Sequence, residues 1–134
     1  MPQHLAAIAI LVPDYDEAIG YYTETLGFEL IEDTALSATK RWVLVAPPGS
    51  SEARLLLAKA TTAEQTRAIG HQSGGRVFLI LHTDDFDRDY ARYQAAGVDF
   101  TEQPRDEAYG KVVVFSDAFG NKWDLVEKPS ARHG

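Results

Sequence analysis

The sequence contains no cysteine, so disulfide bonds, thiolate metal ligands and cysteine nucleophiles are all excluded. This composition fits a reducing compartment. Basic residues are also scarce, because 13 lysines and arginines stand against 20 acidic residues, for a net charge of −7. Such a surface repels nucleic-acid phosphates and anionic lipids, so we expect binding to neither nucleic acid nor a membrane.

Long apolar runs are missing as well. The longest one near the start, residues 5–12, is far shorter than the roughly 20 residues that span a bilayer. No basic segment precedes it, as it would in a secretory signal peptide. The chain also has no histidine pair at the spacing of a helical metal site and no phosphate-binding glycine pattern. We therefore expect a cytoplasmic protein.

The first half carries a strand–helix–strand pattern. Residues 5–12 alternate bulky and small apolar side chains, which predicts a strand that is buried on both faces. Asp14 or Asp16 can cap a helix that runs to about Leu26 and ends at Gly27. Further strands are predicted at 28–32, 40–46 and 54–58, and a short helix capped by Thr62 at 61–69.

The second half repeats this order. A strand is predicted at 76–81, a helix at 86–96, strands at 98–101, 111–116 and 122–127, and polar turns at 102–110 and 117–121. Asp85 follows Asp14 by 71 positions, and Gly97 follows Gly27 by 70. An internal repeat of this kind predicts two modules of the same architecture.

Three segments in this order resemble the vicinal-oxygen-chelate superfamily of glyoxalase, bleomycin-resistance and extradiol-dioxygenase proteins: VPDYDEAIGYYTETLGFEL, AAGVDF and FSDAFGNKWDLVE. The resemblance covers about residues 5–127 and implies an α+β fold, in which two βαβββ modules form a curved mixed-sheet cleft. It implies one domain over 1–134, with module one at about 4–60, a connector at about 61–75, module two at about 76–128 and a frayed tail at 129–134. It also implies a homodimer.

Metal enzymes of this superfamily take their ligands from the first and fourth strands of each module. Carried over residue by residue, these positions hold Ala7, Leu56, Phe78 and Asp124 in this sequence. Only Asp124 can bind a metal, and one carboxylate does not hold a divalent ion against water. The resemblance therefore implies no metal and no other cofactor, and it disfavours metal-dependent glyoxalase or dioxygenase chemistry.

Candidate ligand-binding residues are Trp42, Phe78, His82, Glu107, Tyr109 and Asp124. Trp42 and Phe78 suit the wall of a small-molecule site, although aromatic residues on strands also form ordinary core. His82 lies four residues beyond Phe78 on one strand, where it either faces the cleft or forms a solvated strand end.

Asp124 lies between apolar neighbours, so its carboxylate needs a partner. The partner is either a donor group of a ligand or a buried cationic side chain. Glu107 and Tyr109 lie in the polar segment 102–110, which either covers the cleft or forms a solvated turn.

The function predicted from these features is binding of a small amphipathic or aromatic molecule in the cleft without a metal. The alternative is a lyase, isomerase or dioxygenase that uses a rearranged metal site or acid–base chemistry through His82, Asp124 and Glu107. A third interpretation is a cleft closed by apolar side chains such as Ala7 and Leu56. Binding without turnover is favoured because the metal-ligand pattern is so thoroughly substituted.

Overall fold

The structure is a computed structural model that describes residues 2–129. The chain divides into two compact units, residues 1–69 and 70–134, with a boundary inside the predicted connector. Of the predicted frayed tail, residues 130–134 lie outside the described part. No helix within residues 2–129 is long and apolar enough to cross a membrane.

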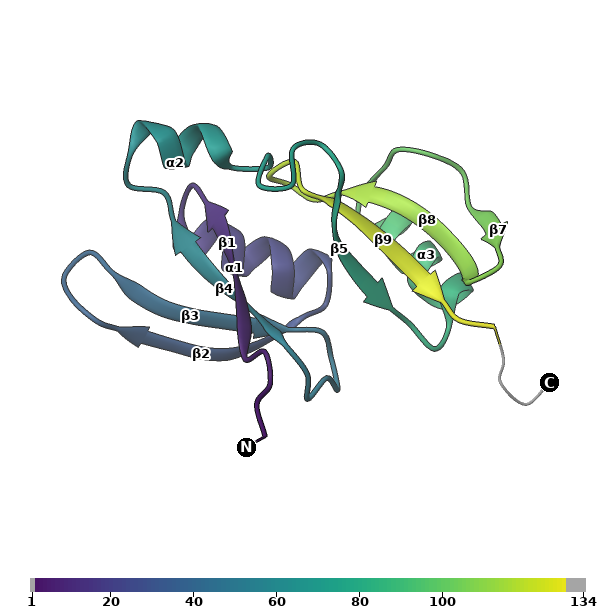
Figure 1. The fold of residues 1–134 in the computed structure, drawn as a ribbon, viewed down its shortest axis with the longest axis horizontal. Helices are drawn as coiled ribbons and strands as arrows, with labels where there is room; N and C mark the ends of the chain where they lie inside the picture. Colours follow the sequence, from purple (N-terminus) through teal and green to yellow (C-terminus); the bar gives the residue numbers. More distant parts are fainter. Residues whose placement is uncertain (1, 130–134) are drawn as a thin grey trace. The chain divides into compact units, whose positions relative to one another are not determined.

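The first unit is a four-stranded mixed sheet with two α-helices and a π-helical turn. Its elements are β1 (Ala7–Val12), α1 (Tyr15–Gly20), the π-helical turn η1 (Tyr21–Thr25), β2 (Glu29–Ala35), β3 (Arg41–Ala46), β4 (Arg54–Lys59) and α2 (Ala63–Ala68). The strand order is β1-β4-β3-β2, and β1 runs parallel to β4 while the other pairs are antiparallel (Figure 1).

Only one face of β1 is buried. Ile10 and Val12 are fully buried, on the face whose core also contains Ala18 and Tyr22 of the first helix. On the other face Ala9 is exposed, and its neighbours two residues away on β1 are partly buried. The predicted burial of this strand on both faces is therefore wrong, because α1 covers a single side of the sheet.

The predicted first helix is confirmed, with a change of winding in its second half. The Asp14 carboxylate accepts a hydrogen bond from the Glu17 N–H at 2.9 Å, and so caps the helix as its short polar side chain predicts. After Gly20 the backbone winds as η1, in which the N–H of Leu26 donates to the carbonyl of Tyr21, five residues earlier. Ala18, Tyr22 and Leu26, from which the helix was predicted, are nevertheless all buried across the change of winding.

The second unit is a five-stranded mixed sheet with one helix. Its elements are β5 (Val77–His82), α3 (Phe86–Ala95), β6 (Asp99–Phe100), β7 (Arg105–Glu107), β8 (Gly110–Ser116) and β9 (Lys122–Glu127). The order is β5-β9-β8-β6, with β5 parallel to β9 and β7 paired to β8. Two sheets with the same order of strands confirm the predicted α+β class.

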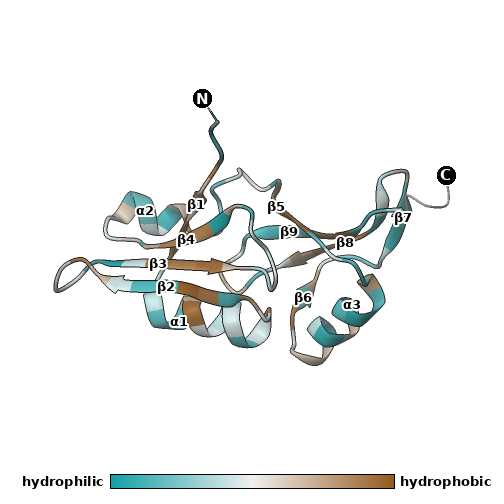
Figure 2. Ribbon diagram, turned by 90° about the horizontal axis from the view of Figure 1, so that it is seen from below, coloured by the Kyte–Doolittle hydropathy of each residue, from teal (hydrophilic) through white to brown (hydrophobic). Residues whose placement is uncertain are grey.

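The core of the second unit lies between its sheet and α3. Phe86 and Tyr93 are buried on α3, whose other residues are mostly hydrophilic (Figure 2). The ring of Tyr93 meets that of Phe115 edge-on with centroids 5.6 Å apart, and Phe115 stacks on Trp123 at 5.7 Å. Aromatic contacts of this geometry contribute beyond the area they bury.

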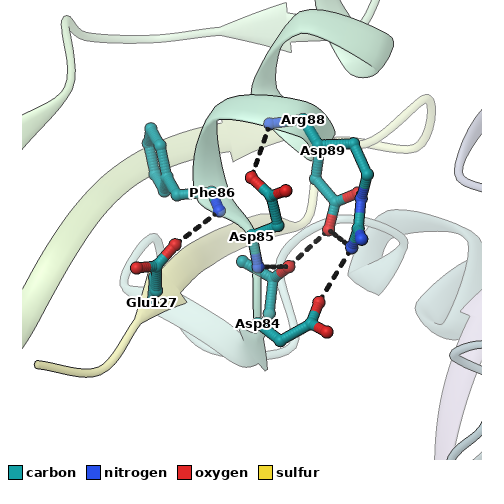
Figure 3. Close-up of polar contacts among 7 residues, drawn as sticks. Asp84, Asp85, Phe86, Arg88, Asp89 and Glu127 are labelled. Atoms are coloured by element: carbon teal, nitrogen blue, oxygen red, sulfur yellow. Dashed lines mark hydrogen bonds and ion pairs between the residues drawn. The ribbon is translucent and has the colours of Figure 1, made fainter. Parts of the chain in front are cut away.

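The start of α3 is fixed by carboxylates (Figure 3). Asp85 caps the helix by accepting from the Arg88 N–H at 3.1 Å. Glu127, the last residue of β9, accepts from the Phe86 N–H at 2.7 Å, and Arg88 forms an ion pair with Asp89 at 3.0 Å. The helix is thereby tied to the end of the strand that carries Asp124.

The turn between β8 and β9 is organised by Asp117, which is 5% exposed. One of its oxygens accepts from the N–H groups of Phe119 and Asn121, at 2.9 and 3.0 Å. The other accepts from the Asn121 amide and from the Trp123 indole N–H, both at 3.0 Å. These bonds give a physical reason for the order of residues in the segment SDAFGNKW.

The predicted turn at 102–110 is wrong in part, because it contains strand β7. Its three residues pair with the start of β8, so that Arg105 lies opposite Val112 and Glu107 opposite Gly110. A three-residue strand of charged residues has no apolar alternation from which it could be predicted.

Candidate functional site

The second sheet has a face opposite to α3 that we call the Asp124 face. Residues paired across neighbouring strands share a side of the sheet, so the register places Ile80, His82, Arg105, Val112, Val114, Asp124 and Val126 on it. Ile80 lies directly opposite Asp124 and is 65% exposed. Asp124 is therefore a carboxyl group among largely apolar neighbours, of which Ile80 is exposed.

The Asp124 carboxyl group is incompletely paired. Its Oδ1 atom is buried and has no hydrogen-bond partner among residues 2–129. Burial raises the pKa of Asp124 above its ordinary value of 3.8, the charge of Arg105 lowers it, and the charge of Glu102 raises it. The net direction is upward, because desolvation is the largest of these effects.

Arg105 is held beside Asp124 by two glutamates. Its Nε donates to Glu102 at 3.1 Å, and its Nη1 forms an ion pair with Glu107. Glu102 also accepts from the backbone N–H of Val114 at 3.0 Å, which fixes the carboxylate against β8. The positive charge of Arg105 is thus shared among carboxylates, and no ion pair joins it to Asp124 within residues 2–129.

The predicted candidates Glu107 and Tyr109 lie on the β7–β8 hairpin beside this network. Arg105 donates to the Tyr109 hydroxyl at 3.4 Å, besides its pairing with Glu107. The Tyr109 side chain is 53% exposed. Both candidates therefore border the Asp124 face, where Tyr109 offers an aromatic ring to solvent.

A β-bulge changes the surroundings of Phe78. Val77 pairs with Lys122 and Leu79 with Trp123, so Phe78 is the extra residue of the bulge. His82 pairs with Val126, two positions along β9 from Asp124, and borders an open hollow of about 540 Å³ with Thr83, Asp84, Glu127 and Lys128. His82 therefore belongs to the Asp124 face but lies at the end of β5, opposite Val126 rather than Asp124.

The candidates in the first unit lie on its sheet. Trp42 is on β3 opposite Thr34 and is 39% exposed. Leu56 lies on β4 between Leu44 and Ala9. Since Ala9 pairs with Leu56 and Ile80, 71 positions later, pairs with Asp124, the two fourth-strand positions are equivalent within their sheets.

The residues present do not fit the metal that the superfamily implies. The four ligand positions offer one carboxylate and three side chains without donor atoms, Ala7, Leu56 and Phe78. Across residues 2–129, no group of three or more histidine, aspartate or glutamate side chains is placed to hold a metal ion. Metal ligation at this site is therefore not supported by its donor set.

Sequence reasoning missed Arg105, Glu102 and Ile80. Arg105 and Glu102 were read as part of a turn, and Ile80 as one apolar residue among several on its strand. The signal that was present is the charge-rich segment TEQPRDE, which directly precedes an apolar strand. That this segment pairs with β8, however, becomes known only from the register of β7 and β8.

Comparisons with known proteins give the chain its family. The model of the Glyoxalase/Bleomycin resistance protein/Dioxygenase superfamily matches residues 4–125. An uncharacterized protein of Shewanella frigidimarina (strain NCIMB 400) is 53% identical over 128 residues, which are 95% of each chain.

Among solved structures, UcmS2 matches with a TM-score of 0.81 and 30% identity, over 94% of this chain and 98% of that one. TnmS3, an antibiotic-binding protein from Streptomyces sp. CB03234, matches with a TM-score of 0.76 and 31% identity, over 96% and 98%. The chain belongs to the Glyoxalase/Bleomycin resistance protein/Dioxygenase superfamily, as the three sequence segments predicted.

Proposed function

We propose that this protein binds a small molecule with an apolar or aromatic body and a hydrogen-bond donor, on the Asp124 face and without a metal ion. The observation that carries the proposal is the buried Oδ1 of Asp124, which lacks a partner in residues 2–129. A buried carboxylate oxygen without a hydrogen bond costs free energy, and a donor on a ligand removes that cost.

The surroundings of Asp124 suit such a ligand. Ile80 and Val114 supply apolar contact on both neighbouring strands, and Tyr109 adds an exposed ring nearby. Glu107 is proposed to border the ligand from β7, and Phe78 and His82 of the same unit remain proposed contacts. Trp42, in the first unit, remains a proposed ligand contact on its own sheet, where it is 39% exposed. The likeness to an antibiotic-binding protein at 31% identity supports small-molecule binding as the class of function.

The enzymatic alternative would need His82, Asp124 and Glu107 to act together. Among residues 2–129 no hydrogen bond joins any two of these three residues, and Glu107 forms an ion pair with Arg105 instead. A raised pKa at Asp124 suits a general acid, but it equally suits a buried carboxyl group that lacks a hydrogen-bond donor until a ligand binds. Binding without turnover therefore stays the proposed function.

The test uses two probes that differ by one amino group, naphthylmethylamine and methylnaphthalene. We expect Asp124→Asn to weaken naphthylmethylamine binding by roughly 10–100-fold, the value of a charge-assisted hydrogen bond. Binding of methylnaphthalene should change by less than about threefold, because it makes no hydrogen bond. Isothermal titration calorimetry of both probes on both proteins measures the difference.

The matched control is Asp106→Asn, which removes the same charge from an exposed position of the same unit. It should leave both affinities unchanged. Equal weakening by the two substitutions would show a general attraction to the acidic surface and would refute a specific role of Asp124.

We further propose a cytoplasmic homodimer. The absence of cysteine supports a reducing compartment. The dimer rests on the family alone, and light scattering of the purified protein measures its mass directly.

A further inference from the structure

A separate open pocket lies in the first unit, where strands β1 and β4 begin. It has a volume of about 550 Å³ and is lined by residues 4–6 and 51–54. The backbone N–H of Arg54 donates to the Ala6 carbonyl at 3.1 Å, and Arg54 pairs with Ala7 in the parallel ladder. The two segments that line the pocket are thus joined where they enter the sheet.

Arg54 differs in its partners from three other arginines, Arg41, Arg88 and Arg105. Arg41, Arg88 and Arg105 each form ion pairs with carboxylates. The Nε atom of Arg54 is buried and has no hydrogen-bond partner among residues 2–129. A buried charged donor without an acceptor costs free energy, and an acceptor from outside the chain that reached this N–H group would remove that cost.

The groups that line the pocket indicate which kind of acceptor it would bind. A guanidinium group presents parallel N–H donors that match the two oxygens of a carboxylate. Leu5 lines the same pocket and is 75% exposed, which provides apolar contact for the rest of an organic molecule. Glu52 also lines it, yet it forms no ion pair with Arg54 in the described part of the chain.

We propose that this pocket binds the carboxylate of a small organic acid through the guanidinium of Arg54. The net charge of −7 does not prevent this, because salt screens charges beyond about 10 Å at 0.1 M ionic strength. The pocket is lined by residues of the first unit alone, whereas the Asp124 face belongs to the second unit, and the two would take ligand groups of opposite charge.

The test is a titration with sodium benzoate, with sodium chloride added to hold the ionic strength constant. The side-chain Nε–Hε signal of Arg54 is followed by ¹H–¹⁵N NMR and is assigned by its loss in Arg54→Lys. We expect this signal to move saturably. Arg54→Gln should weaken benzoate binding by roughly 10–100-fold, because it removes a charge-assisted bidentate contact.

Two further variants separate the proposed site from general effects. Arg67→Gln removes the same charge from the exposed face of α2 and should leave the affinity within about twofold. Glu52→Gln should tighten benzoate binding by about two- to fivefold, because it removes a negative charge from the pocket that receives the benzoate carboxylate. The Glu52→Gln result also tests the site if Arg54→Gln does not fold.

An Arg54 signal that does not move with benzoate would overturn the proposal. Equal weakening by Arg54→Gln and Arg67→Gln would overturn it too, because it would assign the effect to total charge. Inorganic phosphate at the same ionic strength should move the signal less than benzoate does, since it lacks an apolar body for Leu5. An equal response would refute the assignment to organic acids.

Discussion

Replacement of Asp117 by alanine is expected to lower the free energy of unfolding by about 3–5 kcal/mol, the range for leaving buried polar partners unpaired. Four donors from three residues of the β8–β9 turn lose their acceptor, among them the indole N–H of Trp123. Trp123 is 3% exposed, so water does not replace the lost bond freely. Urea unfolding followed by circular dichroism measures the change.

Two further variants delimit this effect. Asp117→Asn keeps one acceptor oxygen and should cost about 1–3 kcal/mol. Asp106→Ala makes the same chemical change as Asp117→Ala at an exposed position and should stay within about 0.5 kcal/mol of the parent protein. A loss below about 1 kcal/mol in Asp117→Ala would show that the turn does not depend on this carboxylate.

Replacement of Asp124 by leucine is expected to stabilise the protein by about 1–3 kcal/mol while it abolishes the preference for naphthylmethylamine. The stabilisation follows because the partly buried carboxyl group has a buried oxygen without a partner in residues 2–129. The neighbouring positions Ile80 and Val114 are apolar, so leucine suits the surface. A gain in stability together with a loss of binding is typical of a residue retained for function.

The gain in stability from Asp124→Leu should depend on pH. Burial raises the folded-state pKa of Asp124, so between the unfolded value near 3.8 and that higher value the folded protein binds more protons than the unfolded chain. The stability of the parent protein therefore falls as the pH rises through this window. The stability difference from Asp124→Leu should be largest above the window, shrink as the pH falls through it and level off below 3.8.

Unfolding curves of the two proteins across this pH range provide the measurement. Asp106→Leu serves as the control, since its side chain is exposed and should show no such dependence. A destabilised Asp124→Leu variant at neutral pH would mean that the carboxylate is satisfied within the folded protein, and the proposed binding role would lose its main support.

Much of the fold could be predicted because the signals are local. Asp14 and Asp85 both precede helices and both cap them through their carboxylates. Gly27 ends the helical region that Asp14 begins, and Gly97 ends the helix that Asp85 begins. Their positive φ angles of 76° and 82° are ones that only glycine adopts easily. Helix caps of this kind depend only on a few neighbouring residues, so they can be predicted from the sequence.

The features that escaped prediction depend on pairing between distant residues. The bulge at Phe78 is invisible in the sequence, because counting back from Asp85 assumes regular alternation along β5. Likewise, Arg105 reaches the side of Asp124 only because β7 pairs with β8 and β8 with β9. Asp124 itself was predicted from the closing motif, whereas its unpaired oxygen follows from packing alone.

The central claim is that Asp124 is a carboxyl group poised to accept a hydrogen bond from a ligand. Its titration, followed by the ¹³C NMR signal of its carboxyl carbon with and without saturating naphthylmethylamine, tests this most directly. We predict a pKa of Asp124 above 3.8 in the free protein and a lower pKa when the probe is bound, because the ammonium group favours the ionised carboxylate. A pKa at or below 3.8 in the free protein, or one that the probe leaves unchanged, would contradict it.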